Sequence, residues 1–239
     1  MKSMMMGAAL TGLLLTAMPA FAQAPSAAIT AAVADAVRTD ADKAVDAMRK
    51  PAETVAFAGV KPGDKVAELN PGGGYFTRIF SKLVGANGKV YTFAAPRPGA
   101  PPPTAPAGTN ATPLSAPLAD FATPEPVDVV WTSRNYHDFQ NAAGLDMVAF
   151  NRKIFAALKP GGVYIVLDHA AAANAAEDVT SKLHRAKEST VRQQVEAAGF
   201  RFAGSSHVLH NAADNGTMPV REQDVAGKTN QFVLKFQKP

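Results

Sequence analysis

Apolar and polar residues alternate along the chain in blocks that predict strands followed by helices. The stretch "KVAEL" (65–69) follows a Pro-Gly turn and predicts a short buried strand. The next block, residues 75–85, places Phe76, Ile79, Phe80 and Leu83 on one face of a helix. "KVYTFA" (89–94) then predicts a second strand. Strand, glycine-rich loop, helix and strand together form the βαβ unit of a parallel sheet.

The same alternation resumes from Val127 onward. "VDVVWTS" (127–133) and "VYIVLDHAA" (163–171) predict strands, and an amphipathic helix is expected between them at 144–158, closed by "KPGG". Residues 178–200 predict one or two helices. The last patterns, 201–210 and 230–238, predict an antiparallel strand pair at the sheet edge. The fold expected is a Rossmann-like, doubly wound α/β sheet, mostly parallel, with a C-terminal antiparallel pair.

Composition divides the chain into segments. Residues 1–22 combine Lys2, a short apolar run and "AFA" before the expected cleavage site after Ala22, as in an export signal. Residues 23–60 are alanine-rich and predict an N-terminal helical cap, and 61–239 form the α/β domain. Within that domain, 94–117 holds eight of the 18 prolines and is expected to be an extended surface loop. The chain is therefore expected to be periplasmic or secreted, with no stable membrane insertion after cleavage.

Charge and cysteine usage narrow the classes of function. The formal net charge of +4 is small and evenly spread, so the chain is not expected to bind nucleic acid. The absence of cysteine excludes disulfides, a thiolate nucleophile and cysteine metal sites. A small-molecule ligand or acceptor is the expected partner, and the sequence leaves the oligomeric state open.

Polar residues follow three of the predicted parallel strands, whose carboxyl ends meet at one rim of the sheet. Glu68 and Asn70 follow the first, 134–138 follow the strand at 127–133, and Asp168 and His169 end the third. His184 joins them from the next helix. Histidine beside a carboxylate can act as a general base, can bind a divalent cation, or can simply hydrogen-bond a loop. The sequence does not distinguish between these three roles of the histidines.

The helical cap has its own charged residues at spacings of about four. They are Arg38, Asp42, Asp46 and Arg49. They either form exposed ion pairs along the cap or build one wall of the pocket.

The stretch "VAELNPGGGYFT" (66–77) resembles the first motif of class I S-adenosylmethionine-dependent methyltransferases. In that motif an acid ends the first strand and a glycine-rich loop follows it. The wider pattern resembles a subgroup of exported predicted methyltransferases, over most of the chain from about Arg49. The resembling segments are "RKPAETVAFAGVKPGDKVAELNPGGGYFT", "NYHDF", "LKPGGVYIVLDHAA", "LHRAKESTVRQQVEAAGF" and "KTNQFVLKFQKP".

The resemblance implies a cofactor site for S-adenosylmethionine. Glu68 would meet the methionine end, and the glycines would let the backbone approach the ligand. The full set of expected cofactor-binding residues is Glu68, Asn70, Gly72, Gly73, Gly74, Tyr75, Asp120 and Asn135. The chain departs from the family pattern at Asn70, where a glycine is usual, and at Ala94 and Ala95, where an acid usually holds the ribose.

The expected catalytic residues are Tyr136, His137, Asp138 and His169. The leading hypothesis is methyl transfer to a small acceptor, with a rim histidine taking the acceptor's proton. A second hypothesis is a non-catalytic exported protein that binds another ligand in the same cleft. A third is metal-assisted chemistry at the His/Asp rim, although no tight ligand motif is present and no metal ligands are assigned.

Overall fold

A computed structural model of the chain describes residues 24–239. The expected export signal lies outside these residues. Within them, no helix combines the length and the apolar character needed to cross a bilayer.

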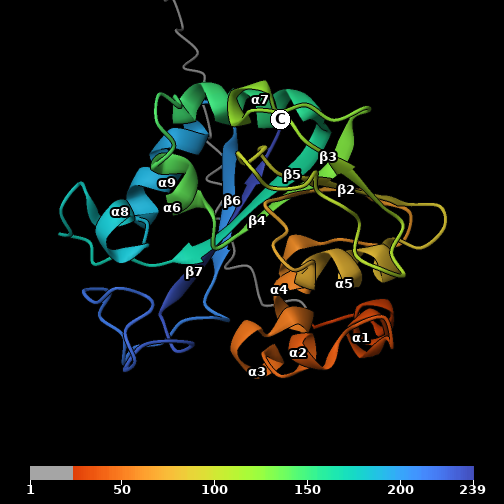
Figure 1. Ribbon diagram of the computed structural model, residues 1–239, viewed down its shortest axis with the longest axis horizontal. Helices are drawn as coiled ribbons and strands as arrows, with labels where there is room; N and C mark the ends of the chain where they lie inside the picture. The colour runs from red at the N-terminus through yellow and green to blue at the C-terminus, as the bar shows by residue number, and fades with distance from the viewer. Residues whose placement is uncertain (1–23) are drawn as a thin grey trace, which may run out of the picture.

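The order of elements follows the alternation in the sequence (Figure 1). The helices are α1 (Ala27–Ala34), α2 (Asp40–Lys43), α3 (Asp46–Arg49), α4 (Pro51–Ala58), α5 (Tyr75–Val84), α6 (Tyr136–Gln140), α7 (Met147–Ala157), α8 (Val179–Leu183) and α9 (Glu188–Glu196), with a 3-10 turn at Leu118–Asp120. The strands are β1 (Lys65–Leu69), β2 (Lys89–Phe93), β3 (Ala111–Leu114), β4 (Val127–Ser133), β5 (Leu158–His169), β6 (Arg201–Ser206) and β7 (Gln231–Gln237).

These seven strands form one sheet in the order β3-β2-β1-β4-β5-β7-β6. Only β7 runs antiparallel to its neighbours, β5 and β6. In the register Leu69 lies beside both Phe93 and Thr132, so the chain leaves β1, β2 and β4 at the same edge. The expected parallel sheet with a C-terminal antiparallel pair is confirmed.

The sheet is buried on both faces, as its apolar strands require. On one face Phe76 and Phe80 of α5 pack against Trp131 of β4. On the other face Phe121 lies between Phe93 of β2 and Phe150 of α7. Figure 1 shows α4 and α5 on one side of the sheet and α7 on the other, with α1 to α3 beyond α5.

Local sequence signals set several helix ends. Gly74 has a φ of 80°, which allows the sharp entry into α5. The Asp146 carboxylate accepts hydrogen bonds from the backbone N–H groups of Val148 and Ala149 at the start of α7. Thr39 and Asp42 form a reciprocal capping box on α2.

Two expectations about strands were wrong. The proline-rich segment 94–117 is not wholly loop, because residues Ala111–Leu114 form β3 beside β2. Pro113 is tolerated there because β3 is an edge strand, where a missing N–H need not face a neighbour. His207 and His210 lie beyond the end of β6 rather than within a late strand.

Candidate functional site

The glycine-rich loop between β1 and α5 is held in a left-handed path. Asn70 has a φ of 48°, a conformation that Asn tolerates better than most residues, and Gly72 has a φ of 56°. The backbone N–H of Asn70 donates to the carbonyl of Phe93 at 2.8 Å. The side chain of Asn135 donates to the carbonyls of Leu69 and Asn70 at 3.3 and 3.2 Å. Asn135 therefore fixes the loop from the neighbouring strand end.

A cavity of about 250 Å³ opens at this loop. Its walls include Glu68 from β1, Arg49 from the cap and Arg134 from the end of β4. The expected cofactor-binding residues that line it are Glu68, Asn70, Gly72, Gly73, Tyr75 and Asn135. Side chains at Gly72 and Gly73 would extend into open space, whereas one at Gly74 would collide with Pro106. Gly74 thus serves close packing of the proline-rich segment rather than ligand approach.

Glu68 is the buried acid of the cavity. Its side chain is 3% exposed, and Thr77 Oγ1 donates to Glu68 Oε2 at 2.5 Å. Burial raises the pKa of Glu68 to about 8, although Thr77, Arg49 and Arg78 act in the opposite direction. The carboxyl is therefore largely protonated at neutral pH and can become an anion when a cationic group enters the cavity.

The helical cap forms one wall of this site. The structure thus supports a pocket wall, rather than exposed ion pairs, as the arrangement of the cap's charged residues. Arg78 of α5 donates to Asp42 at 2.6 and 2.8 Å and to the carbonyl of Gly73 at 2.8 Å. Asp42 is 5% exposed. Buried hydrogen bonds thus tie the cap directly to the glycine-rich loop.

A second buried contact joins the cap to Tyr75. The Tyr75 hydroxyl donates to Asp46 Oδ1 at 2.5 Å, and Arg38 pairs with the same carboxylate. The Arg49 guanidinium lies 4.4 Å from the centre of the Tyr75 ring. Burial, followed by the hydrogen bond to Asp46, raises the pKa of the Tyr75 phenol. Tyr75 is therefore part of the wall, with its hydroxyl already occupied.

The rim beyond β4 and β5 is organised by Asp168, which is fully buried. Its carboxylate accepts from the backbone N–H of His137 at 2.9 Å and of His169 at 2.7 Å. It also lies 2.8 Å from His137 Nδ1. Burial alone would lower the pKa of His137, but the hydrogen bond and charge of Asp168 outweigh it, and the pKa is raised.

The other rim residues lie around His137. His137 Nε2 is 3.3 Å from Asp138 Oδ1, and His184 Nδ1 is 3.7 Å from the same oxygen. His169 Nδ1 lies 2.7 Å from Thr229 Oγ1, and burial lowers the pKa of His169 to about 4. The structure therefore brings together His137, Asp138, His169 and His184, as the strand-end argument expected.

Two expected site residues lie elsewhere. Tyr136 is fully buried in the core, where its hydroxyl accepts from Asn151 at 2.8 Å and donates to Gln194 at 3.1 Å, so the structure gives no support to the catalytic role expected for it. Tyr136 is the first residue of α6 and follows the end of β4, and its aromatic ring packs into the core. Asp120 is exposed and does not line the cavity at the glycine-rich loop.

Arg49 and Arg134 were not among the expected binding residues, although the sequence placed Arg134 in the polar cluster at the rim and allowed Arg49 as part of a pocket wall. Arg49 carried a signal, because it belongs to the charged series of the cap. Arg134 carried little, since its φ of 60°, rare for a residue other than glycine, is visible only in the structure.

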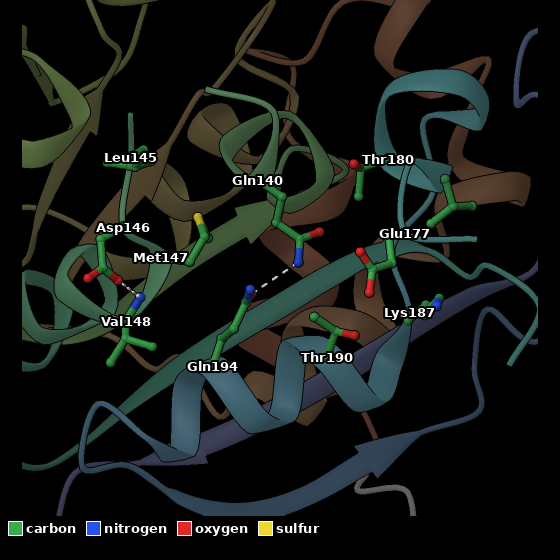
Figure 2. A pocket seen from close by; sticks show the side chains of 11 residues that line it. Gln140, Leu145, Asp146, Met147, Val148, Glu177, Thr180, Lys187, Thr190 and Gln194 are labelled. Atoms are coloured by element: carbon green, nitrogen blue, oxygen red, sulfur yellow. Dashed lines mark hydrogen bonds between the residues drawn. The ribbon is translucent and has the colours of Figure 1, made fainter. Parts of the chain in front are cut away.

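Two of the other cavities bear on the size and place of a ligand. One of about 300 Å³ follows β2 and β3 and is lined by Ala94, Ala95, Arg97, Ser115 and the prolines at 101–103. A larger one of about 480 Å³ involves α6, α7 and α9 (Figure 2). In it Gln140 Nε2 donates to Gln194 Oε1 at 3.0 Å. None of the residues that end β1, β4 or β5 lines this larger cavity, which therefore lies apart from the strand-end site.

Comparison with known proteins yields neither a matching family model nor a matching curated protein. Solved structures do match, and what they show is the fold. The chain has the fold of the class I methyltransferases. An S-adenosylmethionine-dependent methyltransferase from Aquifex aeolicus superposes with a TM-score of 0.55 at 17% identity, over 84% of this chain and 100% of that one.

Two other structures show how far this fold extends. The complex of the Haloferax volcanii methyltransferase activator Trm112 with what is described as a putative methyltransferase gives a match with a TM-score of 0.56 at 19% identity, over 89% of this chain and 98% of that one. The cyclase SpnF matches with a TM-score of 0.54 at 13% identity, over 83% and 81%. At these identities the likeness establishes the methyltransferase fold, and the reaction must be argued from the site.

Proposed function

We propose that the protein is an S-adenosylmethionine-dependent methyltransferase that acts on a small acceptor. The observation that carries the proposal is the charge arrangement of the cavity at the glycine-rich loop. It presents the carboxyl of Glu68 together with the guanidinium groups of Arg49 and Arg134. An amino acid carries one ammonium and one carboxylate, and these are the groups that such a cavity would pair. The methionine end of S-adenosylmethionine has both.

The size of the cavities supports a ligand that extends along the rim. The space at the glycine-rich loop, about 250 Å³, lies below the roughly 300–1,000 Å³ of typical ligand pockets, so it suits one end of the cofactor. The apolar cavity after β2 and β3, about 300 Å³, follows the adjacent strand end and suits the adenosine end. Ala94 and Ala95 offer the ribose no carboxylate, which would weaken binding by roughly 10- to 100-fold relative to a site with one.

The rim supports the transfer itself. Methyl transfer needs an acceptor aligned with the sulfonium methyl group and a group that receives the acceptor's proton. His137, Asp138 and His169 provide imidazole and carboxylate groups where β4 and β5 end, close in sequence to the cavity residues Arg134 and Asn135, and Asp168 fixes the orientation of His137. No observation among residues 24–239 favours the alternative of a non-catalytic binding protein.

We also propose that the protein acts outside the cytoplasm. The support is the sequence of residues 1–22, with Lys2, an apolar run too short to span a bilayer, and "AFA" before the expected cleavage site.

Calorimetric titration of the protein with S-adenosylmethionine and with S-adenosylhomocysteine tests the function. We expect one-to-one binding of both, and a loss of roughly 10- to 100-fold in affinity for Glu68→Gln, because the charged hydrogen bond to the ammonium disappears. Glu177→Gln, an exposed residue of the larger cavity, is the matched control and should bind as the unmodified protein does. Absence of binding at millimolar ligand would refute the proposal. Equal affinity in Glu68→Gln would show that the ligand does not contact Glu68 at the end of β1.

A further inference from the structure

The rim gathers three side chains of the kinds that bind metal ions. Each of His137, Asp138 and His184 offers one ligand atom within 4.8 Å of the others. His137 Nε2 and His184 Nδ1 lie 3.3 and 3.7 Å from Asp138 Oδ1. Two of these side chains come from the start of α6 and the third from the residue that ends α8. Helices α6 and α8 contact each other directly, so the arrangement does not depend on a long loop.

Asp168 determines which atom of His137 faces this group. Its buried carboxylate lies 2.8 Å from His137 Nδ1 and holds that nitrogen as the donor. In the neutral imidazole the lone pair of Nε2 is then directed toward Asp138 Oδ1, 3.3 Å away. A carboxylate that orients a histidine through its second nitrogen is the usual outer partner of a metal-binding imidazole.

A single proton cannot link all three atoms to one another. It could join Nε2 of His137 to Asp138, but His184 Nδ1 would remain 3.7 Å from that oxygen, too far for a hydrogen bond. A metal ion can satisfy them. With bonds of about 2.1 Å, a tetrahedral ion separates its ligand atoms by about 3.4 Å, between the two distances seen.

We propose that His137, Asp138 and His184 bind a divalent transition-metal ion, with zinc as the probe. Two imidazoles and one carboxylate match the preferences of zinc and of its neighbours in the first row, whereas magnesium and calcium prefer oxygen ligands alone. The proposal rests on this geometry and goes beyond methyl transfer; with the ion bound, His137 and Asp138 are ligands, so that of the three rim groups His169 is left to receive the acceptor's proton.

The exposure of the ligands fits an ion that exchanges with solvent. The His137 side chain is 5% exposed, but those of His184 and Asp138 are 37% and 50% exposed. The site is thus anchored on one side and open on the other. Three protein ligands leave the fourth tetrahedral position for water or for an acceptor oxygen.

Metal binding to the full chain, purified without a histidine tag and stripped with a chelator, tests the proposal. Calorimetry should show one zinc ion per chain, and cobalt should give the strong visible absorption of a tetrahedral site. His184→Gly removes the imidazole yet suits the φ of 53° at that position, and Asp138→Asn removes the carboxylate charge. Each should weaken zinc binding at least about tenfold.

The matched control is the double variant His207→Ala/His210→Ala, which removes two histidines whose rings lie 6.0 Å apart outside the rim. It should bind zinc as the unmodified chain does, and circular dichroism should show all variants folded. Failure of the unmodified chain to bind zinc at one per chain would overturn the proposal. So would full affinity in His184→Gly, or loss of binding in the double variant. Because no methyl donor is present, the result is independent of the titration with S-adenosylmethionine.

Discussion

Glu68 shows at the scale of one residue how burial prepares a binding group. A carboxyl enclosed by β1, α5 and the cap is held neutral because desolvation penalises its anion, and Thr77 offers only partial compensation. An ammonium group of a ligand placed beside Glu68 would stabilise the anion and offset part of the cost of its desolvation. Asn70 in the glycine-rich loop and His184 at the rim both adopt left-handed backbone angles, which residues other than glycine rarely hold.

Glu68 should make stability depend on pH. Its pKa is about 8 in the folded protein and near the ordinary value of 4.5 in the unfolded chain, so between these values the folded state holds the extra proton. The free energy of unfolding should therefore fall as pH rises from about 4.5 to about 8. Denaturant unfolding across this range measures the free energy of unfolding of the protein and of Glu68→Gln. The difference between the two gives the contribution of Glu68, because the histidines titrate in both.

In Glu68→Gln this part of the pH dependence should disappear, and Glu177→Gln should retain it. Parallel stability curves for the protein and Glu68→Gln would show that the carboxyl titrates normally in the folded state.

At the scale of elements, the cap is the part of the structure that gives the methyltransferase fold its particular pocket. Helix α1 packs on α5, and Ile29 and Ala32 join the same apolar cluster as Phe76 and Ile79. The polar contacts then fix the direction of the glycine-rich loop, because Arg78 reaches both Asp42 and the carbonyl of Gly73. Local unfolding of the cap should therefore also disorder the glycine-rich loop.

The Asp42–Arg78 pair should be costly to break. Asp42→Ala leaves a buried guanidinium without its partner, and we expect a loss of about 3–5 kcal/mol in the free energy of unfolding. The matched control is Glu196→Ala, which removes the exposed pair with Arg192 at 3.9 Å and should change stability by less than about 0.5 kcal/mol. Equal effects of the two substitutions in denaturant unfolding would contradict the role given to the pair.

Across the whole molecule, much of the fold could be predicted from the sequence because the strands are strongly apolar and are separated by amphipathic helices. β3 was missed because four residues within a proline-rich segment give no periodic signal, and Pro113 argues against a strand except at an edge. The rim could be anticipated because strand ends follow from the pattern. The inward turn of Tyr136 and the approach of Arg134 could not, since they depend on side-chain packing and on a single backbone angle.

Export can be tested on the whole chain. When it is expressed with residues 1–22 in a Gram-negative host, we expect the protein in the periplasmic fraction with Gln23 as its first residue, by N-terminal sequencing. Replacing Leu13 and Leu14 with arginine should keep it in the cytoplasm at full length, because the apolar run is interrupted. An intact N-terminus on the unmodified chain would contradict cleavage.

The position of β7 affects when the protein can fold. This strand is the last in chain order, yet it pairs with β5 on one side and β6 on the other. The sheet therefore stays open until residues 231–237 have left the ribosome, and every growing chain before that point lacks one of its inner strands. For a protein that we propose to be exported, this delay would keep the nascent chain loose enough to pass through a translocation channel before its core closes.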